Sequence, residues 1–161
     1  MVDDASQDNG VTIRQATTAD IADLVRLRRM MFEAMEFSGP DLDAAEAIWT
    51  AYFGEAIPAG EFHGWLALTP EGEAVSACGV VIDRHPPTPG NLSGRIGYLM
   101  NVVTVPQYRG LGLARRVIQT ALQWLNEQGI QRVTLHATDM GQSLYASLGF
   151  EPVPNEMRLT K

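Results

Sequence analysis

The fold is decided by residues 95–128, which read RIGYLMNVVTVPQYRGLGLARRVIQTALQWLNEQ. Residues 95–105 are the longest β-rich run of the chain and predict the central strand of a sheet. Pro106 ends that run because proline lacks the N–H that a strand ladder needs. Residues 112–128 place apolar side chains at helical spacing and predict the best helix of the sequence. A strand therefore leads, through a turn with two glycines, into a long amphipathic helix.

The flanking segments place this unit in a domain that mixes helices and strands. A strand at residues 131–137 implies a parallel pair joined by a right-handed crossover helix. We expect an α/β (α+β) fold: a mixed, mostly antiparallel central sheet of about six to seven strands, flanked by about four helices. The other expected elements are a strand at residues 11–16, a helix capped by Thr18 or Asp20 that ends before Ser38, a helix at 42–53, a hairpin over 63–69 and 74–83, a short helix at 141–148, and short strands around 150–153 and 157–160.

Composition narrows the class of protein. With 161 residues, 45% of them hydrophobic and 19% charged, the chain fits one globular domain, expected at residues 11–161 after a disordered tail at residues 1–10. A net charge of −7 disfavours a nucleic-acid partner. Cys78 is the one cysteine, so we expect neither a disulfide nor a metal site. The chain shows no signal peptide and no apolar run of membrane length, which predicts a cytoplasmic protein without membrane contact.

The turn between the long strand and the long helix has the features of an anion-binding site. Unpaired N–H groups and the helix dipole meet at a helix start. Gly110 and Gly112 allow close approach of a diphosphate, small Ala114 keeps the first helical turn open, and Arg109 and Arg115 add positive charge. The spacing matches neither a Walker loop nor a dinucleotide fingerprint. For two glycines alone, an ordinary strand-to-helix turn is the simpler interpretation.

Three motifs in a fixed order give the turn a more specific meaning. Arg109-x-x-Gly112-x-Ala114, preceded by a long strand, resembles the R/Q-x-x-G-x-G/A motif of the GNAT superfamily of acyl-CoA N-acetyltransferases. LYASLGF at residues 144–150 resembles the L-Y-x-x-L-G-F signature of that family, and residues 13–20 resemble its opening strand and first helix. The resemblance covers about residues 11–153.

The resemblance implies transfer of an acetyl group from acetyl-CoA to a primary amine, by direct attack in a ternary complex. In the family, the parallel strands splay apart, pantetheine enters the gap, and the loop amides hold the pyrophosphate. Cys78 is then a core residue rather than a nucleophile. The implied cofactor-binding residues are Val103, Thr104, Val105, Arg109, Gly110, Leu111, Gly112, Leu113, Ala114, Arg115 and Thr138, the last standing where the family often has asparagine.

The resemblance also implies catalytic roles. Tyr145 matches the tyrosine that protonates the leaving thiolate, and the alternative is a core aromatic with a bonded hydroxyl. The central strand lacks the carboxylate that serves some members as a base, so we expect a neutral amine or a water relay, which Asn101 would orient. His136 is expected in the core, and His63 is a weaker candidate for the acceptor cleft.

The acceptor side is expected on the segment that follows the first strand. Within residues 30–62, Glu33 and Glu36 would attract a cationic amine, and an apolar wall would be formed by Met31, Met35, Phe37, Trp49 and Phe53. The alternative is a core stripe beside a solvated helix face. A small molecule, an amino acid or a peptide N-terminus would serve as acceptor, and the family suggests a homodimer. Two further hypotheses are a non-catalytic acyl-CoA-binding module and a protein that binds another phospholigand.

Overall fold

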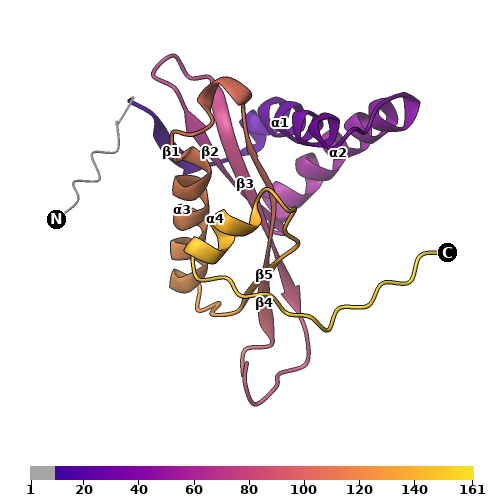
Figure 1. Cartoon of the computed structure of the whole chain (residues 1–161), viewed down its shortest axis with the longest axis vertical. Helices are drawn as coiled ribbons and strands as arrows, with labels where there is room; N and C mark the ends of the chain where they lie inside the picture. The colour runs from indigo at the N-terminus through magenta and orange to yellow at the C-terminus, as the bar shows by residue number, and fades with distance from the viewer. Residues whose placement is uncertain (1–9) are drawn as a thin grey trace.

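The computed structural model describes residues 10–161 (Figure 1). Its centre is a five-stranded sheet in the order β1 (Thr12–Gln15), β2 (Phe62–Leu68), β3 (Ala74–Arg84), β4 (Arg95–Thr104) and β5 (Val133–Leu135). Neighbouring strands from β1 to β4 pair antiparallel, and β5 pairs parallel with β4. The expected mixed, mostly antiparallel sheet is confirmed. The tail predicted at residues 1–10 lies, apart from Gly10, outside the described residues.

Helices cover both faces of the sheet. α1 (Ile21–Ala34) and α2 (Pro40–Ala59) pack together on one face, while α3 (Leu113–Glu127) lies on the other (Figure 1). Consecutive residues of β2 show the two faces, because Gly64 approaches Leu24 of α1 and the Trp65 ring contacts Trp124 of α3. The remaining elements are the short helix α4 (Gln142–Ser147) and two single 3-10 turns, η1 (Thr18–Asp20) and η2 (Pro106–Tyr108).

The start of the first helix is fixed by a capping box. Of the two expected caps, Asp20 is the N-cap residue of α1, and Thr17 caps the 3-10 turn that precedes it. The Thr17 backbone N–H donates to the Asp20 carboxylate at 2.7 Å, and its hydroxyl accepts from the Ala19 amide at 3.3 Å. Arg14 of β1 donates two hydrogen bonds of 2.8 Å to the same carboxylate, which ties the first strand to the first helix.

Two elements differ from the sequence prediction in position or length. β3, with 11 residues and neighbours on both sides, is the central strand, so the central position predicted for residues 95–105 is wrong. α2 is longer than the predicted residues 42–53. It begins at Pro40 because proline at the first helical position gives up only an N–H that has no partner there. It continues through Pro58 and ends before the left-handed Gly60.

The C-terminal end also departs from expectation. The strands predicted at residues 150–153 and 157–160 do not form, and β5 is limited to three residues, so the sheet has five strands instead of six to seven. Val153, Met157 and Leu159 are almost fully exposed on an extended segment. An alternating apolar pattern makes a strand only where a partner edge is available, and the short β5 offers little edge.

Close packing of α3 on the sheet positions the loop that precedes it. Val117, Ile118 and Leu125 of this helix are fully buried. Gly97 of β4 is needed at the contact, because a Cβ there would lie 3.0 Å from a methyl group of Leu125. α3 is thereby held directly against the strand that leads into it. No helix in residues 10–161 is long and apolar enough to cross a membrane.

Candidate functional site

The parallel strands β4 and β5 part halfway along β4. They pair from Gly97↔Val133 to Leu99↔Leu135 only, whereas β4 continues to Thr104. Beyond Leu99, this edge of β4 therefore has no strand partner among the described residues. This early end of the ladder is what the expected splayed pair requires, and the unpaired edge of β4 from Met100 to Thr104 is called the gap below.

A β-bulge lies at the point where the gap opens. The register of β3 against β4 passes from Ala77↔Val103 to Gly79↔Met100, so Asn101 and Val102 together lie opposite Cys78. Asn101 has the left-handed φ of 54°, which asparagine tolerates better than most residues. A bulge redirects the backbone of the strand that carries it. The backbone at Asn101 and Val102 is therefore turned at the entrance of the gap.

Backbone groups at the end of β4 alternate between β3 and the gap. The Val103 carbonyl accepts a hydrogen bond from the Ser76 hydroxyl at 3.0 Å, and the Val105 amide donates to the Val75 carbonyl at 2.9 Å. Because neighbouring residues of a strand point their backbone groups to opposite sides, those of Thr104 face the gap. Of the three residues predicted to contact pantetheine, Thr104 is thus the one with its backbone directed there.

The glycine loop leaves a row of amides without protein partners. Gly110 and Gly112 have φ values of 77° and 73°, and a Cβ at either position would meet nothing within 4 Å. Gly112 is the N-cap of α3 and provides no side-chain cap. Within residues 10–161, the amides of residues 110–115 donate no hydrogen bond to the protein. Leu113 is buried and anchors the first turn of the helix, while Leu111 is exposed.

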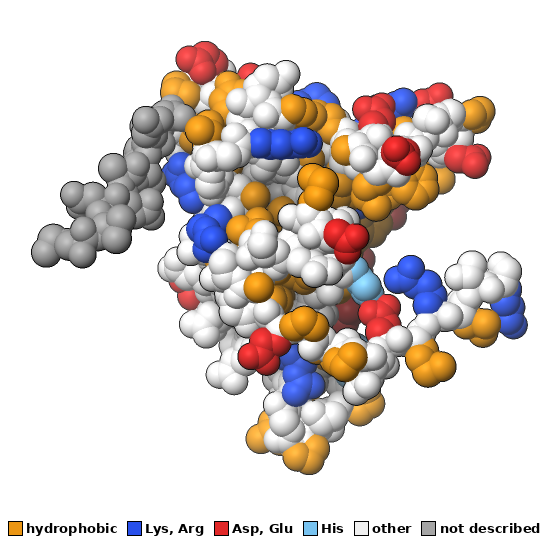
Figure 2. Space-filling view, viewed as in Figure 1, with side chains coloured by type: hydrophobic (Ala, Val, Ile, Leu, Met, Phe, Trp, Pro, Cys, Tyr) orange, Lys and Arg blue, Asp and Glu red, His pale blue; other side chains and the backbone are white. Residues whose placement is uncertain are grey.

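Arginine side chains surround this helix start without being neutralised. Arg109 donates from Nε to the Thr104 carbonyl at 3.2 Å, and Arg115 donates from Nη2 to the Ser147 hydroxyl at 2.6 Å. Arg116 donates to the Val11 carbonyl at 3.0 Å. In the described part of the chain, none of the three forms an ion pair. Basic side chains gather around the start of α3 in Figure 2.

Tyr145 of α4 is a half-buried phenol with a free hydroxyl. Burial raises its pKa, and the Cys78 thiol beneath the bulge contributes in the same direction. Its ring packs edge-on against Phe150, with the ring centroids 5.9 Å apart. The hydroxyl forms no hydrogen bond with any described residue, unlike a core tyrosine whose hydroxyl is satisfied. Tyr145 is therefore protonated at neutral pH. Thr138 is exposed in the turn before α4.

The side chain of Asn101 is held by Arg28 of α1. The Arg28 Nη1 group donates to the Asn101 Oδ1 atom. Nε of the same guanidinium is buried and has no partner. Arg28 is not among the residues predicted for the site, and its one signal in the sequence is its place beside Arg29 on an amphipathic helix.

A hydrogen-bonded chain of three side chains lies where β5 ends. The Tyr98 hydroxyl is 2.6 Å from Nδ1 of His136, whose Nε2 is 2.7 Å from the Glu156 carboxylate. His136 is exposed, so its expected place in the core is wrong. The hydrogen bond to His136 lowers the pKa of Glu156. His63 packs against Trp124 on the α3 face, away from α1.

The residues predicted for the acceptor do not converge. Glu33 pairs with Arg29 at 2.8 Å, in a cluster that joins α1 to α2. Met31 packs against the core, whereas Met35 and Glu36 are exposed at the end of α1. A cationic amine attracted by Glu33 would therefore have to compete with Arg29 for the carboxylate.

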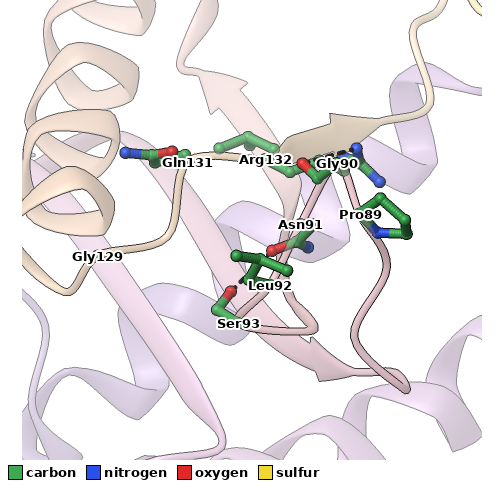
Figure 3. Close-up of a pocket in the computed structure, with 9 residues that line it drawn as sticks. Pro89, Gly90, Asn91, Leu92, Ser93, Gly129, Gln131 and Arg132 are labelled. Atoms are coloured by element: carbon green, nitrogen blue, oxygen red, sulfur yellow. Dashed lines mark hydrogen bonds between the residues drawn. The ribbon is translucent and has the colours of Figure 1, made fainter.

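Two hollows lie outside the gap. One of about 720 Å³ is lined by residues 89–93, Gly129 and residues 131–133, beside the start of β4 and so at the opposite end of that strand from the glycine loop (Figure 3). The other, of about 560 Å³, is lined by Tyr52 and the end of α2 together with Val81 and Ile82 of β3. Within residues 10–161, no group of three side chains could hold a metal ion.

Comparison with known proteins agrees with this geometry. The family described as acetyltransferase (GNAT) matches residues 24–150. The chain belongs to the GNAT acetyltransferase family. It is 27% identical to the thialysine N-epsilon-acetyltransferase of Bos taurus over 86% of this chain and 83% of that protein. It is 30% identical to the aminoglycoside N(6')-acetyltransferase type 1 of Stenotrophomonas maltophilia, over 76% and 72% of the two chains.

A solved structure extends the likeness to the whole GNAT fold. A protein described as a predicted acetyltransferase from Clostridium acetobutylicum, crystallised with acetyl-CoA, superposes with a TM-score of 0.85 at 25% identity. The match covers 93% of this chain and 96% of that one. The residues described here fit such a cofactor, because unpartnered amides for a diphosphate lie next to an open strand edge.

Proposed function

We propose that this chain transfers an acetyl group from acetyl-CoA to a primary amine in a ternary complex. The observation that carries the proposal is the row of unpartnered amides at residues 110–115, placed beside the free edge of β4. Membership of the GNAT family supports the reaction class, and the curated relatives act on amines as different as thialysine and an aminoglycoside.

The proposed cofactor contacts are mainly made by the backbone. The amides of residues 110–114 donate to the diphosphate at the positive end of the α3 dipole. Arg109 and Arg115 raise the local potential and form no ion pair with any carboxylate of residues 10–161. Thr104, whose carbonyl also accepts a hydrogen bond from Arg109, directs its backbone to the gap and contacts pantetheine there, so its strand position matters more than its side chain.

The proposed chemistry uses groups that line the same gap. The cofactor supplies an activated acetyl group as a thioester. The Val102 amide, turned by the bulge, donates to the carbonyl oxygen on which charge develops. Tyr145 donates its hydroxyl proton to the departing thiolate, and its raised pKa keeps that proton in place until it is needed. Cys78 takes no part, because burial raises the pKa of its thiol.

The proton of the incoming amine requires an acceptor other than a carboxylate on β4. His136 lies next to the last paired residue of β5, at the opening of the gap. Glu156 fixes the Nε2–H tautomer, so the lone pair of Nδ1 faces the Tyr98 hydroxyl. We propose that a proton passes from the amine to the Tyr98 oxygen while the Tyr98 proton moves to His136. Glu156 then stabilises the imidazolium.

A second candidate function is a non-catalytic acyl-CoA-binding module on the same fold. The observation that favours it is the lack of any carboxylate in the sequence of β4. Turnover separates the two candidates. Thiol release from acetyl-CoA is measured with a panel of primary amines, and acetyl-CoA affinity is measured by calorimetry.

The variant Tyr145→Phe tests whether the protein is an enzyme that uses the tyrosine hydroxyl. This change removes one oxygen and keeps the ring that packs on Phe150, so the fold is retained. For an enzyme, kcat falls by about 100- to 10,000-fold while acetyl-CoA Kd changes less than threefold. If the wild-type protein binds acetyl-CoA tightly but releases no thiol with any amine of the panel, the non-catalytic module is favoured.

A further inference from the structure

Arg28 is a partly buried cation that has no counter-ion among the residues that the structure describes. Its one hydrogen bond within residues 10–161 is the contact of Nη1 with Asn101, and it forms no ion pair there. Nε is buried and unpartnered, which is costly for a charged group. Burial lowers the pKa of Arg28, as expected where no carboxylate compensates the charge, although an arginine stays protonated.

The next residue, Arg29, does have carboxylate partners, so the lack of a partner is particular to Arg28. Arg29 pairs with Glu33, Asp43 and Glu46 at 2.8, 2.9 and 2.5 Å, so the nearby carboxylates of α1 and α2 are directed to it. Adjacent helix residues point about 100° apart. Arg28 therefore faces the sheet, away from the acidic cluster, in a protein whose net charge is −7.

The guanidinium is held in a fixed orientation. It lies 4.9 Å from the ring centroids of both Phe32 and Trp49, and these two rings stack on each other at 5.4 Å. Nη2 makes no hydrogen bond to residues 10–161 and is not fully buried, so a ligand can reach this edge of the group. An arginine stacked on aromatic rings with one free edge presents a rigid fork of donors, which suits a carboxylate or a phosphate.

The position of this fork is next to the proposed reaction site. Asn101, which Nη1 contacts, belongs to the bulge at the free edge of β4. The 560 Å³ hollow lies on the same side, because Tyr52, which lines it, is three residues after Trp49 on α2. Glu61 and Asp83 also line this hollow and could hold the amine of an acceptor. Figure 2 shows the molecule hollowed between the α1–α2 pair and the C-terminal segment, with hydrophobic side chains below the helices.

We infer that Arg28 binds an anionic group of the acceptor, so that the substrate is an amine that also carries a carboxylate or a phosphate. This inference rests on the proposed acetyl transfer and adds the class of acceptor. The accessible Nη2 group donates hydrogen bonds to the oxygen atoms of the anion. The hydrogen bond from Nη1 to Asn101 keeps the guanidinium directed at the bulge. An amine with cationic groups only would lie against an uncompensated positive charge. The acceptor site is then selective in the opposite sense to that expected from Glu33 and Glu36.

The test uses pairs of amines that differ by the anion alone. L-Lysine is compared with cadaverine, which lacks the carboxylate, and glucosamine 6-phosphate with glucosamine, within a wider panel of amines with and without such groups. Thiol release gives kcat/KM for each. We expect the fastest substrates to carry an anion and to exceed their anion-free counterparts by about 10- to 100-fold. The first pair tests a carboxylate and the second a phosphate.

Variants assign the preference to Arg28. Arg28→Met keeps an unbranched side chain on the rings and is expected to raise KM for the anionic amine about 10-fold or more, leaving its anion-free counterpart unchanged. Arg28→Lys retains part of the preference. Arg132→Met, at the far end of β4, makes the same change in net charge and serves as the control. Acetyl-CoA Kd and thermal unfolding establish that Arg28→Met is folded and binds the cofactor.

The two possible failures are distinguishable. If the wild-type protein binds acetyl-CoA but turns over no amine, the proposed function fails and the inference fails with it. If amines are turned over and the fastest carry no anion, or Arg28→Met affects both members of a pair equally, the inference is overturned while the acetyl transfer stands.

Discussion

The glycine loop provides a sharp test of cofactor binding through the substitution Gly112→Val. Gly112 has a φ of 73° and its missing side chain faces open space, so valine clashes with nothing in the protein. The left-handed backbone costs an L-residue about 1–2 kcal/mol, with a β-branched residue at the upper end. For a domain of this size, we expect the melting temperature to fall by about 4–8 °C.

The cost to binding is separate from the cost to stability. A valine at the N-cap of α3 projects into the space where the diphosphate is proposed to lie, and it displaces the anion from at least one amide. A hydrogen bond to a charged group contributes about 1.5–3 kcal/mol, which corresponds to an increase of about 10- to 150-fold in acetyl-CoA Kd.

Gly129→Val is the matched control. Gly129 has a φ of 74°, and a Cβ there also meets nothing within 4 Å, but the residue follows the other end of α3. Both variants are therefore expected to lose similar melting temperature, and only Gly112→Val to lose affinity in calorimetry. Equal Kd values for the two variants would show that the diphosphate does not bind at the start of α3.

Two further predictions concern the capping box and the proton path. Asp20→Asn is expected to destabilise the fold by about 1–2 kcal/mol at pH 7, because its hydrogen bonds with Arg14 hold the pKa of Asp20 at about 2, below its usual 3.8. The stabilisation is present above pH 4 and is lost as the pH falls toward 2. Denaturant unfolding at pH 7 and at pH 2.5 measures it, and a difference from wild type that stays constant with pH would contradict the assignment. His136→Gln is expected to lower kcat about 10-fold or more with acetyl-CoA Kd unchanged, whereas unchanged kcat would remove His136 from the proton path.

The part of the fold that could be predicted is the part governed by local rules. Proline at residue 106, the glycines at 110 and 112 and the helical spacing after them fix β4, the loop and α3 within a few residues. The predicted strands at 150–153 and 157–160 failed because a strand depends on a partner edge, which a local pattern does not reveal. The predicted start of this helix at residue 42 is two residues late, because Pro40 is compatible with the first helical position.

The site shows the same division. The amides of the loop were predictable because glycines and a helix start expose them wherever they occur. Arg28 was not, since its importance comes from a missing counter-ion and from a contact with Asn101, 73 residues away in sequence. The histidine chain was also missed, because it joins β4, β5 and the C-terminal segment only in three dimensions.

A recognition surface made of main-chain amides has an evolutionary consequence. Every residue type supplies the same N–H, so the side chains of a loop like the one at 110–115 are free to drift as long as its two glycines and the tilt of the following helix are kept. If the proposed acetyl transfer holds, selection on the acceptor amine acts elsewhere, on positions such as those of the first helix, and leaves the backbone contacts to acetyl-CoA unchanged.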